Sequence, residues 1–463
     1  MAAPVARFRG ALSAPGLIKS LRRTFSAVPD ARRAKSVRYS LADTLGSAFA
    51  MFSLKYPSML RFDEESHADP RLIHNLAALY GVEHVPSDTS MREILDKVDP
   101  VELRPAFESL QGELQRGKAL ESFTVLEGRY LLAVDGTGQF ASTAISCPHC
   151  CVKKASKKKS KKANAASPSK DDAGGGGQFY HQSLAAALVH PDIKGIALPI
   201  ALEPITRADG AAKNDCERNA AKRLLPYIAE AYPRRRFCVV EDALASNGPH
   251  IELLLELGMD FILGVKPDGN AALFAEVHRR QGAGELVEWE DQEAADGSIS
   301  GYRFTCSLAL NASHENLDVN YLEWWECDKN GKQTSFTWVT NLPITIENVF
   351  EIMRAARARW RIENEVFSTL KNQGYEYEHN FGHGKRHLSS TLAALMMLAF
   401  LVDQIQEHAC RVFKEARTKR GTKATLWLQM RAMMTTWRMT GWKMMMDLLI
   451  DPDRVLMPSS ESG

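Results

Sequence analysis

Three carboxylates stand at positions where the chain could hold divalent metal ions. Asp135 follows the apolar run 130–134 and Asp242 follows the run 236–241, so each is expected at the end of a strand. Glu363 lies on a segment with helical periodicity, in the middle of its apolar face. Carboxylate oxygens suit Mg²⁺ or Mn²⁺, and two such ions can activate an attacking water and stabilise the leaving oxygen of a phosphodiester. These residues therefore indicate metal-dependent phosphodiester chemistry.

Each of these carboxylates also has a purely structural interpretation. Asp135 precedes residues 136–138, Gly-Thr-Gly, and aspartates are common in tight turns. A carboxylate on an apolar face needs a partner, and Arg359, one turn before Glu363, could supply an ordinary i,i+4 ion pair. Glu365 is the rival third carboxylate. An ideal helix turns it about 200° away from Glu363, toward solvent, so helical geometry favours Glu363.

The cysteines leave a second metal chemistry open. Four residues that could bind a soft metal ion lie within five positions: Cys147, His149, Cys150 and Cys151. No second group of such ligands with matching spacing follows them. Zinc at this group is therefore an open alternative. The eight cysteines of the chain show no framework of short regular spacings, which favours a reducing compartment. We expect a cytoplasmic protein.

Positive charge is concentrated in three blocks, although Lys and Arg (58) barely outnumber Asp and Glu (56). Residues 1–40 carry nine basic residues and one acid, residues 153–170 carry eight lysines and no acid, and a third block spans 411–443. Any one block could be a solvated surface, and the first also has the composition of a transit peptide. Three blocks together favour a phosphate-rich partner such as DNA.

The elements that must position the carboxylates are predicted from apolar periodicity and from Pro, Gly and Asn-Gly turn signals. The order of strands and helices predicts an α/β fold with a mixed sheet flanked by helices. The longest apolar run, 392–402, is shorter than the ~20 residues that a membrane-spanning helix needs, so we expect no membrane span. The expected segments are a disordered basic arm (1–39), a helical domain (40–125), the α/β core (126–268) with a disordered Lys/Gly-rich loop (153–177), a β-rich insertion (269–340), a long helix with its following loop (341–387), and a helical C-terminal region (388–463).

The stretches 134–137 (VDGT), 240–243 (VEDA) and 359–363 (RWRIE), followed by Phe367 and Lys371, resemble the DDE transposases of bacterial insertion sequences. The resemblance is to the cut-and-paste group with a Tyr-Arg-Glu-Lys signature, and it covers roughly residues 40–450. It implies an RNase H-like core with a β insertion before the last catalytic helix. It also implies Mg²⁺- or Mn²⁺-dependent cleavage of double-stranded DNA at transposon ends, strand transfer into target DNA, and a homodimer in the synaptic complex.

In this resemblance Asp135, Asp242 and Glu363 are the catalytic, metal-binding triad and Arg359 is the signature arginine. The chain departs from the pattern twice. Ala356 replaces the signature tyrosine, and the usual lysine position holds a leucine, with Lys371 one residue later. A nuclease with the same core but no strand transfer, and a non-catalytic DNA-binding derivative, remain alternatives.

Further DNA contacts are expected around this triad. Arg359 and Lys371 are expected to face the DNA, and the helical segment 40–125 is expected to bind the transposon ends. His383, Lys385 and Arg386 are expected in a DNA-contacting loop, with a merely structural loop as the alternative. In the insertion, strand alternation sends Trp324 and Trp325 to opposite faces, so that one could stack on a base unless both pack in the core.

Overall fold

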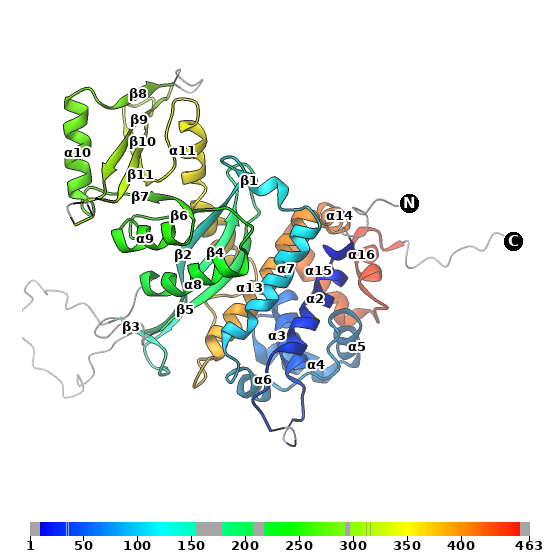
Figure 1. Ribbon diagram of the computed structural model, residues 1–463. Coiled ribbons are helices and arrows are strands. Elements are labelled where there is room, and N and C mark those ends of the chain that lie inside the picture. The colour runs from blue at the N-terminus through cyan, green and yellow to red at the C-terminus, as the bar shows by residue number, and fades with distance from the viewer. Residues whose placement is uncertain are drawn as a thin grey trace, which may run out of the picture.

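The computed structural model describes residues 10–33, 35, 37–153, 178–206, 217–291, 297–311, 313–314 and 316–453. Within them an eleven-stranded mixed sheet runs through the molecule, in the order β3–β4–β2–β6–β7–β11–β10–β9–β8, with β1 beside β2 and β5 beside β4. Helices flank this sheet (Figure 1). The predicted α/β fold with a mixed sheet is confirmed. The loop expected at 153–177 lies, apart from residue 153, outside the described residues.

The core half of the sheet comes from the central part of the chain. β4 is antiparallel to both β2 and β5, whereas β6 and β7 continue the sheet in parallel with β2. β5 and β6 are buried almost throughout, because helices cover the sheet and the strands read as continuous apolar runs. The elements are β1 (Thr124–Val125), β2 (Arg129–Ser142), β3 (Cys151–Lys153), β4 (Gln178–Val189), β5 (Leu198–Ile205), α8 (Glu217–Ala231), β6 (Phe237–Glu241), α9 (Gly248–Glu256) and β7 (Asp260–Gly264).

The insertion extends this sheet instead of forming a separate one. β11 pairs with β7 in antiparallel register, and the hairpin predicted at Asn330-Gly331 is confirmed, with Gly331 at φ +79°. The insertion is not all β, because it opens with a helix that packs on β9. Its elements are α10 (Ala271–Gly282), β8 (Val287–Glu290), β9 (Ile299–Ala309), β10 (Asp318–Cys327) and β11 (Gln333–Thr340).

The single long helix predicted after the insertion is broken into three pieces. α11 spans Val349–Arg357, a π-helix (η6) spans Ile362–Phe367, and α12 spans Ser368–Asn372. A π-helix closes i→i+5 hydrogen bonds and so turns less per residue than an α-helix. The faces of the three pieces are therefore not in one register. α12 ends two residues before Gly374, whose φ is +85°.

The basic arm predicted at 1–39 is not disordered where it is described. α2 (Ala14–Ala27) buries Leu17, Ile18, Leu21 and Phe25 against α3 and α7. Burial of each such side chain contributes roughly 1.5–3 kcal/mol, enough to order the segment. The prediction followed the charge of the segment and overlooked this apolar stripe, which shares the helix with its basic residues.

Helices from both ends of the chain pack together on one side of the sheet, with α13 between them and the strands (Figure 1). The apolar run 392–402 lies within α13, a 22-residue helix that is long and apolar enough to cross a membrane by length and composition alone. α13 is a core helix, because 94% of its apolar 18-residue stretch is buried inside the protein. The helices are α3 (Leu41–Ser53), α4 (Met59–Ala68), α5 (Pro70–Asn75), the π-helix η2 (Leu76–Tyr80), α6 (Asp88–Leu95), α7 (Arg104–Arg116), α13 (Leu388–Ala409), α14 (Arg411–Arg420), α15 (Lys423–Thr436) and α16 (Trp442–Ile450), with short 3₁₀ turns at Pro100–Leu103 and Glu121–Phe123.

Candidate active site

Asp135 lies on β2, and Asp242 directly follows β6, the parallel strand beside it. The last residue pair between β2 and β6 is Ala133 with Val240. Two residues further along each strand stand Asp135 and Asp242, at matching positions beyond the carboxyl end of this pairing. Adjacent strands are ~4.8 Å apart, so the two side chains can serve one site. Both line a cavity of about 380 Å³.

The tight turn predicted after Asp135 is not present. β2 continues through Gly136, and neither Gly136 nor Gly138 has a positive φ. The carboxylate of Glu217, the first residue of α8, occupies the place that a Cβ at Gly136 would take. Glu217 accepts a hydrogen bond from Gln182 Nε2 (3.1 Å) and lines the same cavity as Asp135. Sequence reasoning missed this fourth carboxylate, since nothing local links a helix start to a distant strand.

Arg359 connects the third carboxylate to the first. Its Nη1 lies 2.6 Å from Glu363 Oε1 and 3.1 Å from Asp135 Oδ2. Burial raises the pKa of Asp135 to about 7; the charge of Arg359 opposes this rise and that of Glu363 adds to it. The i,i+4 ion pair considered for Glu363 is thus present, and it also reaches Asp135.

The predicted burial of Glu363 is wrong. Its side chain is 46% exposed, although its neighbours Val366 and Phe367 are buried. The prediction assumed 100° per residue along one α-helix, and the π-helix at this point breaks that periodicity. Glu363 therefore meets Arg359 and Asp135 at the edge of the core instead of inside it.

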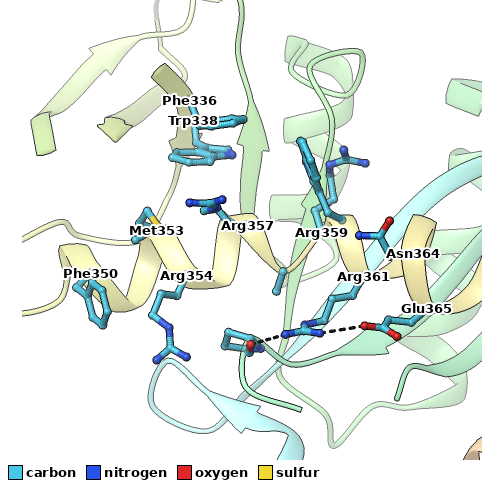
Figure 2. A pocket seen from close by; sticks show the side chains of 14 residues that line it. Phe336, Trp338, Phe350, Met353, Arg354, Arg357, Arg359, Arg361, Asn364 and Glu365 are labelled. Atoms are coloured by element: carbon cyan, nitrogen blue, oxygen red, sulfur yellow. Dashed lines mark hydrogen bonds and ion pairs between the residues drawn. The ribbon is translucent and has the colours of Figure 1, made fainter. Parts of the chain in front are cut away.

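Glu365, the rival carboxylate, is also placed differently from the prediction. Its side chain is only 20% exposed and pairs with Arg361 at 3.1 Å. Arg361 in turn donates to the carbonyl oxygen of Pro191 at 2.5 Å, on the other side of the helix from Phe336 (Figure 2). Glu365 is thus not solvent-facing. Of the two glutamates, Glu363 is the one joined to Asp135.

Basic and aromatic side chains surround a second cavity, of about 500 Å³, beside this helix. Figure 2 shows Arg357 lying below Phe336 and Trp338, while Arg354 and Arg361 point to the opposite side. Arg357 is exposed, stacks 4.5 Å from the centre of the Trp324 ring, and makes no ion pair with a carboxylate among the residues described. Sequence reasoning did not single out Arg357.

The aromatic residues predicted to stack on DNA lie elsewhere. Trp324 is 6% exposed and packs against Phe336, so the expectation that it contacts DNA is wrong. Trp325, on the opposite face as predicted, covers Gly301, where a Cβ would clash with its ring. Two exposed aromatic side chains line the cavity instead, Trp360 at 52% and Phe350 at 54%.

The other predicted DNA contacts are divided between surface and interior. Lys371 pairs with Glu378 at 2.9 Å, and the side chains of Lys385 and Arg386 are exposed. His383 is buried, with Nδ1 3.3 Å from Cys150 Sγ, so the expectation that it reaches DNA is wrong.

Cys150 belongs to a cluster of four soft ligands. In the described part of the chain, the one group of at least three possible metal ligands within 4.8 Å of one another is Cys147, Cys150, His181 and His383. Cys151 and His149, expected from the sequence, are not members. The three carboxylates of the triad do not meet this closely.

Part of the chain matches a known protein family. Residues 202–401 match the family described as transposase DDE domain, a range that contains Asp242, Arg359 and Glu363 but begins after Asp135. A search of curated proteins finds no match. Residues 202–401 are therefore similar to a transposase DDE domain, and the three carboxylates occur in order on β2, directly after β6 and on η6.

Proposed function

We propose that this protein cuts DNA at transposon ends and joins the freed ends to target DNA, with Asp135, Asp242 and Glu363 as its catalytic residues. The observation that carries the proposal is the matched placement of the two aspartates, each two residues beyond the last pair between the parallel strands β2 and β6, with Glu363 joined to Asp135 through Arg359. The strand order β5–β4–β2–β6–β7, in which only β4 is antiparallel to the rest, supports an RNase H-like core.

The chemistry of the donors fits two Mg²⁺ or Mn²⁺ ions. All three groups are carboxylates, the donors that these hard cations prefer. A positive group, the Arg359 guanidinium, already lies between Asp135 and Glu363, which indicates that these two carboxylates need a cation between them. When bound, the ions would activate the attacking water or 3′ hydroxyl and compensate charge on the leaving oxygen.

The protein's own residues would bind and orient the DNA. Arg357, on the segment that leads to Glu363, and Lys385 and Arg386, in the loop after α12, present exposed cations, and such cations hold phosphates without reading sequence. Trp360 offers an exposed aromatic face beside Arg359 on which a base could stack. Binding of the transposon ends by residues 40–125, and a homodimeric synaptic complex, complete the proposal.

The test is replacement of each triad residue by alanine. Asp135→Ala, Asp242→Ala and Glu363→Ala should each abolish Mg²⁺-dependent strand cleavage while DNA binding persists, because metals and positioning supply the catalysis. Glu365→Ala is the matched control, since Glu365 pairs with Arg361 on the same helix, and it should keep substantial activity. Cleavage retained in any one of the three triad variants would remove that residue from the site.

Precleaved ends separate a transposase from a simple nuclease. If the protein joins such ends to a target duplex, strand transfer is part of its activity. A protein that hydrolyses DNA but yields no joined product would be the nuclease alternative, and one with no metal-dependent strand chemistry would be the DNA-binding derivative.

A further inference from the structure

Four side chains from three separate segments meet on the side of β4 away from β6. Cys147 and Cys150 come from the loop after β2, His181 from β4, and His383 from the loop after α12. Their closest atoms are 3.5 Å apart between the two sulfurs, and 3.3 to 3.4 Å apart between sulfur and imidazole nitrogen. Three of the four are buried.

These separations fit four ligands around one ion. With Zn–S near 2.3 Å and Zn–N near 2.0 Å, a tetrahedral site places its sulfur and nitrogen atoms roughly 3.3–3.8 Å apart. A disulfide would need the two sulfurs about 2.05 Å apart, so the 3.5 Å separation describes two free thiols. Two sulfurs and two imidazoles select Zn²⁺ over the hard cations that suit the carboxylate triad.

The surroundings of the cluster also favour a bound ion. The Cys147–Cys150 loop forms a turn in which the backbone N–H of Cys150 donates to the Cys147 carbonyl (3.2 Å), and the N–H of Cys147 donates to Cys150 Sγ (3.3 Å). Phe140 packs edge-on against the His383 ring at 4.5 Å. His383 Nδ1 lies 3.3 Å from the Cys150 sulfur, so this imidazole nitrogen faces the cluster and can serve as a ligand.

We propose that Cys147, Cys150, His181 and His383 bind one structural Zn²⁺ ion. Four protein ligands complete a tetrahedral shell, which is typical of structural zinc and leaves no position for a substrate. The ion would tie the extension of β2, the strand of Asp135, to the loop that follows the helix of Glu363. It would thus hold two parts of the proposed active site in register without taking part in the chemistry.

The loop that carries His383 is also fixed from its other side. Asp96, at the end of α6, accepts hydrogen bonds from the backbone N–H groups of Lys385, Arg386, His387 and Leu388, at 2.9 to 3.2 Å. Gly384, at φ +66°, allows this approach, because a Cβ there would overlap the Asp96 carboxylate. These hydrogen bonds hold the loop in shape without a metal ion. The entropy lost when the four ligands come together is therefore smaller than it would be for a loop without these bonds.

The test is the metal content of the full-length protein, purified without chelator in reducing buffer. We expect about one zinc per chain by elemental analysis. Cys150→Ser and His383→Asn should each lose most of it. Cys151→Ser and His149→Asn are matched controls: the Cys151 thiol points to the Ile205 carbonyl and His149 stacks on His387, so both should keep zinc.

Two further readouts keep the proposal testable if a variant folds poorly. Co²⁺ exchanged into the wild-type protein should give the intense visible absorption of a tetrahedral site with two thiolates. A zinc chelator should lower the Tm of the wild type and of Cys151→Ser. Less than a tenth of an equivalent of zinc after incubation with Zn²⁺, a disulfide joining Cys147 and Cys150, or full zinc content in Cys150→Ser would each overturn the proposal. None of these measurements depends on strand cleavage, so failure here is distinct from failure of the proposed function.

Discussion

At the scale of single residues, the sequence indicates which carboxylates to compare but not what surrounds them. Asp135 and Asp242 were placed by the apolar runs before them, which is a local pattern that strands preserve. Helical periodicity favours Glu363 over Glu365 as the third carboxylate because it predicts a buried side chain, but the side chain of Glu363 is exposed. What distinguishes Glu363 from Glu365 is its link to Asp135 through Arg359. Arg359 and Asp135 are 224 residues apart in the sequence, and no strand or helix periodicity indicates that they are in contact.

This link makes Arg359 a competitor of metal at the proposed site. In Arg359→Ala, Asp135 and Glu363 face each other without a positive partner when metal is absent. We expect the free energy of unfolding to fall by about 1–3 kcal/mol, the usual cost of leaving a charged partner unpaired, and toward the lower end because Glu363 is half exposed. Mn²⁺ should then raise the Tm of this variant more than that of the wild type, as thermal unfolding with and without Mn²⁺ would measure.

The control is Arg357→Ala, an exposed arginine on the same segment with no carboxylate partner among the described residues. It should respond to Mn²⁺ as the wild type does. An equal Mn²⁺ response in both variants would show that Arg359 does not occupy the place of the metal.

At the scale of elements, the order from β2 to β7 could be predicted because each strand and helix carries its own pattern of apolar residues. The break between α11 and η6 could not, because a π-helix needs no special residue and arises where packing demands an extra residue in a turn. The turn predicted after Asp135 failed for a related reason. Glycine permits both a tight turn and the close approach of another side chain to the backbone. Only the position of Glu217 shows that a close approach, and not a turn, occurs at Gly136.

The two glycines of β2 provide a direct test of this interpretation. In Gly136→Ala the new methyl group displaces the Glu217 carboxylate, whereas nothing lies within 4 Å of a Cβ at Gly138. The carboxylate ends a flexible side chain that can move aside, so we expect Gly136→Ala to lose no more than about 1 kcal/mol of stability. Its cleavage rate should fall by up to about 100-fold, because the displaced carboxylate moves within the cavity that Asp135 lines.

Gly138→Ala should stay close to the wild type in both cleavage rate and Tm. Comparable losses in the two variants would mean that β2 simply tolerates no side chain at either position, and that Glu217 is not the cause.

At the scale of the whole molecule, the sequence predicted helices at both ends of the chain but not that they pack together. Lys55 shows how they do. Its Nζ lies 2.7 Å from Asp403 Oδ2 on α13, and 4.0 and 4.2 Å from the ring centres of Tyr375 and Trp427. Burial lowers the pKa of Lys55 and raises that of Asp403, and the charge of each partner opposes the shift. Lys55 and Asp403 are 348 residues apart in the sequence, so the composition around either residue does not indicate that they pair.

This buried pair should stabilise the assembly of N-terminal helices, α13 and the segment after η6. Lys55→Met leaves the Asp403 carboxylate buried without its counter-charge, so the free energy of unfolding should fall by about 3–5 kcal/mol. The double variant Lys55→Met/Asp403→Leu removes both charges and should recover more than half of that loss, even though the Tyr375 hydroxyl loses its acceptor. Lys443→Met removes an exposed lysine, 89% accessible, from its pair with Asp447 and should cost less than about 1 kcal/mol. Chemical denaturation of the wild type and the three variants measures these free energies of unfolding. If the double variant is no more stable than Lys55→Met, the two charges do not act as a pair. The N-terminal helices must then be held to α13 by apolar packing alone.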